Sequence, residues 1–245
     1  MLDPLHQFEI HPIIKLSLGG LDFSFTNASA WMFAITLLAC LFLHLGSRNK
    51  KLIPGAMQSL CESLFSFVSK LVGEQAGSEG VQFVPYIFSL FIFILLANLI
   101  GLLPYSFTIT SHLAVTFTLA MLVFIGITVV GAAKHGVKFF KIFLPSGVPA
   151  FIAPLLIPVE IVSYLSKPIS LSIRLFANMV AGHIVLKIIA SAAVVCAVNS
   201  LVPLIVFPVG INVLLTTFEL FVACLQAYVF TILSCIYLND VLHMH

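Results

Sequence analysis

The chain has 245 residues, of which 61% are hydrophobic and only 8% are charged, with a formal net charge of +2. A soluble domain carries about 25% charged residues, so this composition excludes a soluble globular protein. The positive charge is too small and too scattered for a nucleic-acid-binding protein. Several apolar runs are long enough to cross a hydrocarbon core of about 30 Å, which takes about 20 helical residues. We therefore expect an all-α membrane protein.

The first half of the chain predicts three transmembrane helices and one amphipathic helix. The apolar spans cover residues 28–46, 84–103 and 112–133. Residues 54–73 place apolar and polar side chains on different faces at helical spacing, which is typical of a helix lying in the membrane interface. A soluble helix packed on a partner is the alternative, but the position between two spans disfavours it. EQAGSEG, residues 74–80, is expected to be a loop.

The loops between the spans predict the orientation, because basic residues in short loops mark the cytoplasmic or matrix side. One basic cluster, Arg48 to Lys51, follows the first span, and another, Lys134 to Lys141, follows the third. The connection between the second and third spans, PYSFTITS, has no charge. We expect the N-terminus outside, both basic loops inside and the uncharged loop outside. The polar N-terminal sequence lacks the basic and apolar regions of a cleaved signal peptide.

The C-terminal part holds two longer apolar stretches, residues 150–195 and 203–240, separated by VNSLVP. A continuous helix of about 40 residues would be about 60 Å long, twice the thickness of the hydrocarbon core. Each helix is therefore either strongly tilted or broken into shorter pieces, and prolines near the start of the first stretch permit kinks. We favour two long helices tilted as a hairpin, because no polar loop interrupts either stretch.

Polar side chains follow one stripe of the first long helix. At about 100° per residue, they fall within about 40° of Arg174. They are Glu160, Lys167, Ser170 and Asn178. A charged residue at mid-bilayer costs about 2.5–3.5 kcal/mol even on a lenient scale, and such residues usually mark an ion path. A structural salt bridge is the alternative, but no carboxylate lies within a turn or two of Arg174, so another subunit could supply its counter-charge.

The second long helix also carries polar residues on one face. Gln226 falls within about 20° of Glu219, and Tyr237 falls at about the same angle. If the two helices fold back antiparallel, residues whose numbers add up to about 400 face each other. This pairs Arg174 with Gln226, and His183 with Glu219. Because His183 lies opposite Arg174 on its own helix, that helix has two polar faces offset along its length.

SLSIRLFANMVAGH, residues 170–183, and FELFVACLQAYVFTILSCIYLND, residues 218–240, closely resemble subunit a of the F-type ATP synthases. The resemblance runs over the full chain and includes QFEIHP, LIPGAMQSL, ANLIGLLPYSFTITSH and FLPSGVP. The arginine motif with its downstream glutamine is highly specific. A histidine at position 183 with a glutamate at 219 is similar to the alphaproteobacterial and mitochondrial members, whereas this pair looks exchanged in many other bacteria.

The resemblance implies a proton-translocating stator subunit that couples proton flow to ATP synthesis and has no catalytic nucleotide site of its own. Arg174 would face the mid-membrane carboxylates of a rotating c-ring, against which the two long helices would lie tilted. Two offset half-channels would connect the ring with the two sides of the membrane. The outer one would include His183, Glu219 and Asn98, and the inner one Glu160, Lys167 and Ser170. Asn178, Gln226 and Tyr237 complete the expected set of proton-translocation residues.

The implied partners are the c-ring, subunit b of the peripheral stalk and the other ATP synthase subunits, together with membrane lipid and protons. No nucleic acid, cofactor or metal is expected. The five cysteines form no CxxC pair, so we interpret them as packing residues. The HMH sequence at residues 243–245 could bind a metal, but we interpret it as a solvated tail. The expected location is a bacterial cytoplasmic (inner) membrane or, equally well, the mitochondrial inner membrane, with the whole chain as one membrane domain.

A secondary transporter is the main alternative from a different functional class, since it too would place a charge at mid-membrane. It would need internal repeats, and the sequence shows none. A passive channel or a membrane scaffold would leave the alignment of Arg174 with Gln226 unexplained. Co-purification distinguishes these alternatives, because association with a c-ring supports the resemblance and a lone monomer argues for a transporter.

Overall fold

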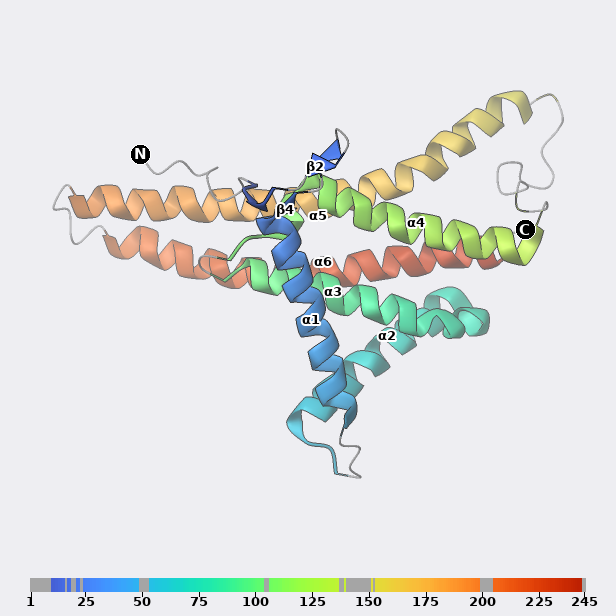
Figure 1. Ribbon diagram of the computed structural model, residues 1–245, viewed down its shortest axis with the longest axis horizontal. Helices are drawn as coiled ribbons and strands as arrows, with labels where there is room; N and C mark the ends of the chain where they lie inside the picture. The colour runs from blue at the N-terminus through green and yellow to red at the C-terminus, as the bar shows by residue number, and fades with distance from the viewer. Residues whose placement is uncertain are drawn as a thin grey trace. The chain divides into compact units, whose positions relative to one another are not determined.

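Figure 1 shows the computed structural model, with its helices coloured from blue at the N-terminus to red at the C-terminus. The structure describes residues 10–15, 17–18, 21–22, 24–48, 53–103, 106–136, 139, 151, 153–198 and 205–243. Most of the two predicted basic loops and of the VNSLVP connection lies outside these residues. The predicted orientation, which depends on those loops, stays a prediction.

Long apolar helices make up most of the described chain, as the composition predicted. Among the described residues, five stretches are long and apolar enough to cross a membrane, and the second of them joins α2 to α3 through the short helix η2. The elements are α1 (Asn27–Arg48), α2 (Ala56–Gly80), η2 (Val81–Phe83), α3 (Val84–Gly101), η3 (Ile109–Ser111), α4 (Leu113–His135), α5 (Ala153–Val198) and α6 (Val206–Leu242). The expectation of an all-α membrane protein with five long apolar helices is confirmed.

Short strands precede α1, which the sequence did not predict. Two antiparallel pairs form, the first between β1 and β4 and the second between β2 and β3. The strands are β1 (Pro12–Ile14), β2 (Ser17–Leu18), β3 (Leu21–Asp22) and β4 (Phe25–Thr26). The side chain of Asn27, at the start of α1, accepts a hydrogen bond of 3.2 Å from the backbone N–H of His11, which ties β1 to the helix.

The helix α2 corrects the expectation that residues 74–80 form a loop. The helix continues to Gly80, and inside it only Gly77, with a φ of 67°, leaves the helical region. Glycine adopts positive φ at no steric cost, so the chain kinks here and then resumes the helix. Lys70 and Glu74 pair at 3.9 Å on an exposed face, while Val68 is fully buried. The location of α2 in the membrane interface stays a prediction.

Both C-terminal helices are continuous. The helix α5 contains 46 residues and includes Pro158 and Pro168 without a break, and α6 contains 37 residues. At a rise of about 1.5 Å per residue, such helices are about 55–70 Å long. The alternative of shorter, broken pieces is therefore not what the structure shows, whereas the tilt and the full-length hairpin stay predictions.

The chain divides into two compact units. Unit 1 consists of Met1–Leu41, Phe93–His112 and Leu175–Ala227. Unit 2 consists of Phe42–Ile92, Leu113–Arg174 and Tyr228–His245. In unit 1, Ala28, Ile35, Ala97, Phe107 and Ile109 form a buried apolar cluster. This cluster packs the segment before η3 against α1 and α3, and that segment supplies one residue of the site described below.

Candidate functional site

His183 of α5 is a buried histidine held by a residue outside the long helices. Its side chain is only 7% exposed, and its Nε2 atom lies 3.0 Å from Oγ1 of Thr108. Thr108 is itself fully buried and donates its hydroxyl hydrogen to the carbonyl oxygen of Gly101, at 3.0 Å. Because an imidazole gains and loses a proton near neutral pH, His183 can exchange protons from a fixed position.

Glu219 of α6 is a buried carboxyl group in the same unit. It is 7% exposed, and neither of its carboxyl oxygens has a hydrogen-bond partner among the described residues. Its side chain packs against Gly182, where a Cβ atom would occupy the same space. A pocket of about 350 Å³ adjoins it and is also lined by Asn178 and Val185. Because a buried carboxylate without a partner is costly, Glu219 needs a proton or water in this pocket.

Three amide side chains lie in unit 1 as well. Nδ2 of Asn178 donates a hydrogen bond of 2.9 Å to Oε1 of Gln226, and Nδ2 of Asn98 donates one of 3.3 Å to the carbonyl oxygen of Ala223. Nε2 of Gln226 and Oδ1 of Asn98 are buried without a hydrogen-bond partner among the described residues. Buried polar atoms are normally paired, so these two atoms are suited to bind water or a passing ionisable group.

Arg174 is exposed on α5, in contrast to the buried residues of unit 1. No hydrogen bond or ion pair joins its guanidinium to another residue that the structure describes. Of the exposed residues one turn away on either side, Ser170 and Ala177 are small, and Asn178 carries an amide. A guanidinium stays charged at pH 7, and a charge inside a membrane needs compensation. An acidic side chain of another chain can therefore reach the exposed guanidinium of Arg174 and supply its counter-charge.

Lys167 of α5 and Asp240 of α6 form an ion pair in unit 2. Nζ of Lys167 lies 2.8 Å from Oδ2 of Asp240, and the two side chains are 24% and 42% exposed. The ammonium group also lies 5.0 Å from the ring centre of Tyr237 and 5.5 Å from that of Tyr164, within the range of cation–π interactions. The Tyr164 hydroxyl in turn lies 2.8 Å from Oγ1 of Thr128. Lys167 is thus fixed within a polar cluster.

The predicted site residues fall into two sets. Unit 1 holds Asn98, Asn178, His183, Glu219 and Gln226. Unit 2 holds Glu160, Lys167, Ser170, Arg174 and Tyr237. Within unit 2, Glu160 is half-buried and Ser170 is exposed, and neither is joined by a hydrogen bond or ion pair to a described residue.

Thr108, Tyr164 and Asp240 contact predicted site residues, but the sequence analysis did not assign them. Asp240 had a usable signal, because a carboxylate in the last turns of an apolar helix needs a partner. Tyr164 lies three residues before Lys167, which places the two side chains on one helix face. Thr108 had no signal, since its hydroxyl lies in an uncharged segment remote in sequence from His183.

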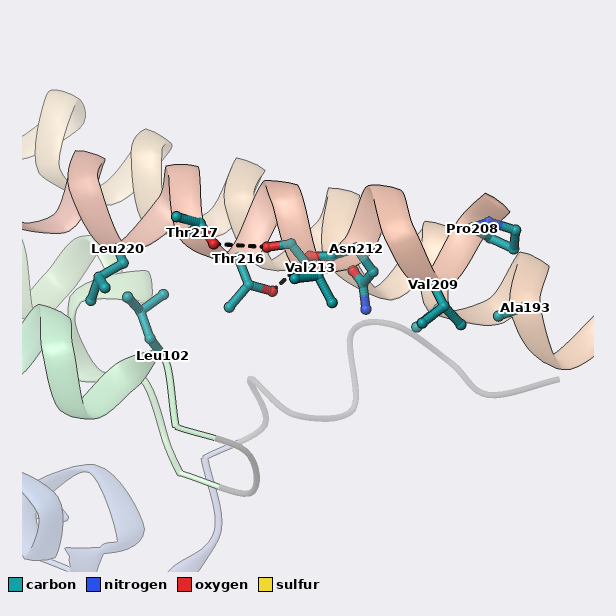
Figure 2. Close-up of a pocket in the computed structure, with 10 residues that line it drawn as sticks. Leu102, Ala193, Pro208, Val209, Asn212, Val213, Thr216, Thr217 and Leu220 are labelled. Atoms are coloured by element: carbon teal, nitrogen blue, oxygen red, sulfur yellow. Dashed lines mark hydrogen bonds between the residues drawn. The ribbon is translucent and has the colours of Figure 1, made fainter. Parts of the chain in front are cut away.

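A second pocket in unit 1, of about 520 Å³, is lined mostly by apolar groups (Figure 2). The hydroxyls of Thr216 and Thr217 donate to the carbonyl oxygens of Asn212 and Val213, at 2.8 and 3.0 Å, so their hydrogen atoms are used within α6. Oδ1 of Asn212 is buried without a hydrogen-bond partner among the described residues. The other lining residues are Leu102, Ala190, Ala193, Pro208, Val209 and Leu220.

The described residues contain no group of three or more His, Cys, Asp and Glu side chains that could hold a metal ion. Of the HMH tail, only His243 is among the described residues, and Met244 and His245 lie outside them. His243 contacts Asn239 through its Nδ1 atom, at 2.8 Å from Oδ1. The expectations about metal and about the tail stay predictions.

The fold and these clusters define a multi-pass membrane protein with buried titratable side chains on its long helices. The family model described as ATP synthase A chain matches residues 29–239. The chain is 51% identical over 244 residues to ATP synthase subunit a of Parvibaculum lavamentivorans, covering 99% of this chain and 94% of that protein. It is 48% identical over 246 aligned positions to ATP synthase subunit a of Rhodospirillum rubrum, covering 100% of both. The chain therefore belongs to the ATP synthase A chain family, the proton-translocating stator subunits of the ATP synthase membrane sector.

Family membership confirms the resemblance that the arginine motif indicated. ATP synthase subunit a of Chelativorans sp. is also similar, with 50% identity over 248 aligned positions and 98% of each chain covered. A subunit of this family serves ATP synthesis through ion transport and holds no catalytic nucleotide site. The family match does not identify the residues that translocate protons, and we infer these from the geometry described above.

Proposed function

We propose that this chain provides two offset half-channels and that Arg174 keeps them apart. His183, Glu219 and the amides of unit 1 would form the outer half-channel, which loads protons onto the carboxylates of a c-ring. Glu160, Lys167, Ser170 and Tyr237 of unit 2 would line the inner one, which releases them. In the chain, Arg174 is the last residue of its stretch of unit 2, and Leu175 opens the next stretch of unit 1.

The exposed, unpaired state of Arg174 is the observation that carries this proposal. Its guanidinium has no ion-pair partner among the described residues, and its exposed neighbours one turn away are the small residues Ser170 and Ala177 together with Asn178. Small residues at a helix surface allow another helix to approach closely in a membrane. A ring helix that presents a carboxylate would therefore reach Arg174 and supply its counter-charge.

Arg174 would act on the ring carboxylate in two ways. Its positive charge favours the ionised carboxylate, so a proton leaves the ring as each carboxylate passes. The same charge repels protons and so separates the two half-channels, as charged constrictions do in selective pores. Each proton that crosses releases about 2.3 kcal/mol per 100 mV of membrane potential. This energy drives rotation only if protons cannot bypass the ring.

We also infer how the chain assembles with other subunits and in which membrane it lies. The two units would serve one membrane domain, with the interfacial helix α2 on the inside and α5 and α6 as a tilted hairpin against the c-ring. Subunit b of the peripheral stalk and the other ATP synthase subunits would hold the chain in place. Because the relatives above are bacterial, we propose the bacterial cytoplasmic membrane as the location. A c-ring that fails to co-purify with the chain would contradict this assembly.

The experiment that tests the function is ATP synthesis in inverted membrane vesicles that carry Arg174→Ala. We expect no synthesis, because the charge that faces the ring is gone. The complex should still assemble, because alanine at position 174 keeps the helix surface small. Arg174→Lys should also fail, since an ammonium is a compact point charge that can lose its proton when desolvated. Lys70→Ala is the matched control, because it removes a positive charge on α2 that is exposed and that pairs, among the described residues, with Glu74. Synthesis at the wild-type rate by Arg174→Ala contradicts the proposal.

A further inference from the structure

Thr108 occupies an unusual position for a residue outside the long helices. Its side chain is 0% exposed, and its single hydroxyl group makes two contacts of 3.0 Å, one with the carbonyl oxygen of Gly101 and one with Nε2 of His183. The segment around it is well anchored. Ser111 donates to the carbonyl oxygen of Thr108 through both its hydroxyl, at 2.6 Å, and its backbone N–H, at 3.2 Å.

Because Gly101 has no side chain, the Thr108 side chain can lie directly against the backbone of α3. A Cβ atom at residue 101 would lie 2.8 Å from Cγ2 and 3.2 Å from Oγ1 of Thr108, closer than side chains normally pack. The Gly101 carbonyl is one of the last of α3, and the last carbonyls of a helix lack partners within it. The Thr108 hydroxyl therefore meets an acceptor that needs a hydrogen atom.

The two contacts together indicate which ring nitrogen of the neutral His183 carries the hydrogen. A carbonyl oxygen can only accept, so the one hydroxyl hydrogen of Thr108 goes to Gly101. The contact between Oγ1 and Nε2 then needs its hydrogen from the imidazole. Ser106 does not replace Thr108 as the donor to Gly101, because its hydroxyl lies 3.2 Å from that oxygen but only 2.6 Å from the carbonyl oxygen of Ile100.

We propose that Thr108 is a positioning residue that holds His183 with a hydrogen on Nε2, so that Nδ1 is the nitrogen that takes up and releases the translocated proton. A proton that reaches Nδ1 converts the neutral ring to imidazolium, and its departure from Nδ1 restores the neutral ring. Nε2 keeps its hydrogen throughout, bonded to Oγ1. The transport role of this exchange rests on the proposed outer half-channel, whereas the tautomer itself does not.

Solid-state NMR of the intact ATP synthase in lipid, labelled with ¹⁵N-histidine, tests the tautomer. The signals of His183 are those that disappear in a His183→Gln complex. At a pH where the ring is neutral, we expect hydrogen on Nε2 in the wild type. Thr108→Ser keeps the hydroxyl and should keep this tautomer. Thr108→Val keeps the shape but removes the hydroxyl, so a mixture of both tautomers should appear.

Thr110→Val is the matched control. Thr110 lies in the same segment, is 2% exposed, and its hydroxyl has no hydrogen-bond partner among the described residues. The control should leave both the His183 spectrum and proton pumping unchanged. Thr108→Val should slow ATP-driven proton pumping by about twofold to tenfold, the range expected for one lost hydrogen bond, and Thr108→Ser should restore it.

Two results overturn the inference in different ways. Hydrogen on Nδ1 of His183 in the wild type, or a Thr108→Val spectrum identical to that of the wild type, overturns the assignment of Thr108. A His183→Gln complex that pumps at the wild-type rate instead overturns the proposed role of His183 in the outer half-channel, and with it the transport function of Nδ1.

Discussion

Gly182→Ala is a small change that should disturb the outer half-channel without unfolding the protein. A Cβ atom at residue 182 would lie 2.8 Å from Cδ and 3.2 Å from Cγ of Glu219, and the carboxyl oxygen Oε1 would be closer still. The end of a glutamate side chain is flexible, so it can move aside while the helices stay packed. In a helix, alanine is also favoured over glycine by about 1 kcal/mol, which supports folding of the variant.

The size of the expected effect follows from the displacement of the carboxyl group. An ordinary contact would need Cδ to move by about 0.6 Å, and overpacking of this kind costs about 1–3 kcal/mol. If that cost opposes the native position of the Glu219 carboxyl, its occupancy falls by a factor of about 5–150. We therefore expect proton entry in Gly182→Ala to slow by a factor of about 5–150.

ATP-driven proton pumping in vesicles, normalised to the amount of assembled complex, measures this effect. Gly210→Ala is the control, because it makes the same change in α6 at a site where, among the described residues, an added Cβ would meet no atom within 4 Å beyond its own stretch of helix. Glu219→Asp shortens the crowding side chain and should partly restore pumping in the Gly182→Ala background. A Gly182→Ala complex that pumps like the wild type would show that Glu219 does not carry protons from this position.

Three further predictions address orientation, the outer pair and the inner pair. The first uses a background from which the exposed Cys40 and Cys224 have been removed. In it, Ser47→Cys should react with a membrane-impermeant thiol reagent only from the cytoplasmic side, and Leu103→Cys, at a position that is 58% exposed, only from the outside. The opposite labelling pattern overturns the predicted orientation. His183→Glu combined with Glu219→His should keep partial pumping, and a complete loss, equal to that of Glu219→Gln, contradicts an exchangeable pair. Asp240→Asn should lower the free energy of unfolding by less than about 1 kcal/mol, because the ion pair with Lys167 is partly exposed. Thermal denaturation of the purified complex measures this change. A loss of several kcal/mol would contradict the prediction and show that the pair is structurally essential.

Periodicity in the sequence predicted the polar residues of the long helices, because a polar side chain is rare enough in a membrane helix to stand out. Arg174 and Glu219 were identifiable for this reason, and the angle between residues then placed their neighbours on common faces. The length of α5 was also predictable, since no polar loop interrupts its apolar sequence. Its two internal prolines did not break it, because proline does not prevent helical geometry where neighbouring helices support the chain.

Residues outside the long helices were beyond sequence reasoning. Thr108 contacts His183 through a hydroxyl in an uncharged segment, and neither periodicity nor charge marks such a group. EQAGSEG was predicted to be a loop, yet α2 continues through it. A single glycine at position 77 accommodates the kink, so local composition did not decide the structure there.

Passive proton flux through vesicles stripped of the catalytic sector tests the barrier role of Arg174 without requiring rotation to be productive. We predict that Arg174→Ala vesicles conduct protons at least as fast as wild-type vesicles and yet make no ATP when the catalytic sector is restored, because both half-channels remain while the charge between them is gone. Adding Glu219→Gln should lower this flux, since it blocks the outer half-channel. Arg174→Ala vesicles that make ATP at the wild-type rate, or that are impermeable to protons although fully assembled, would contradict the role proposed for Arg174.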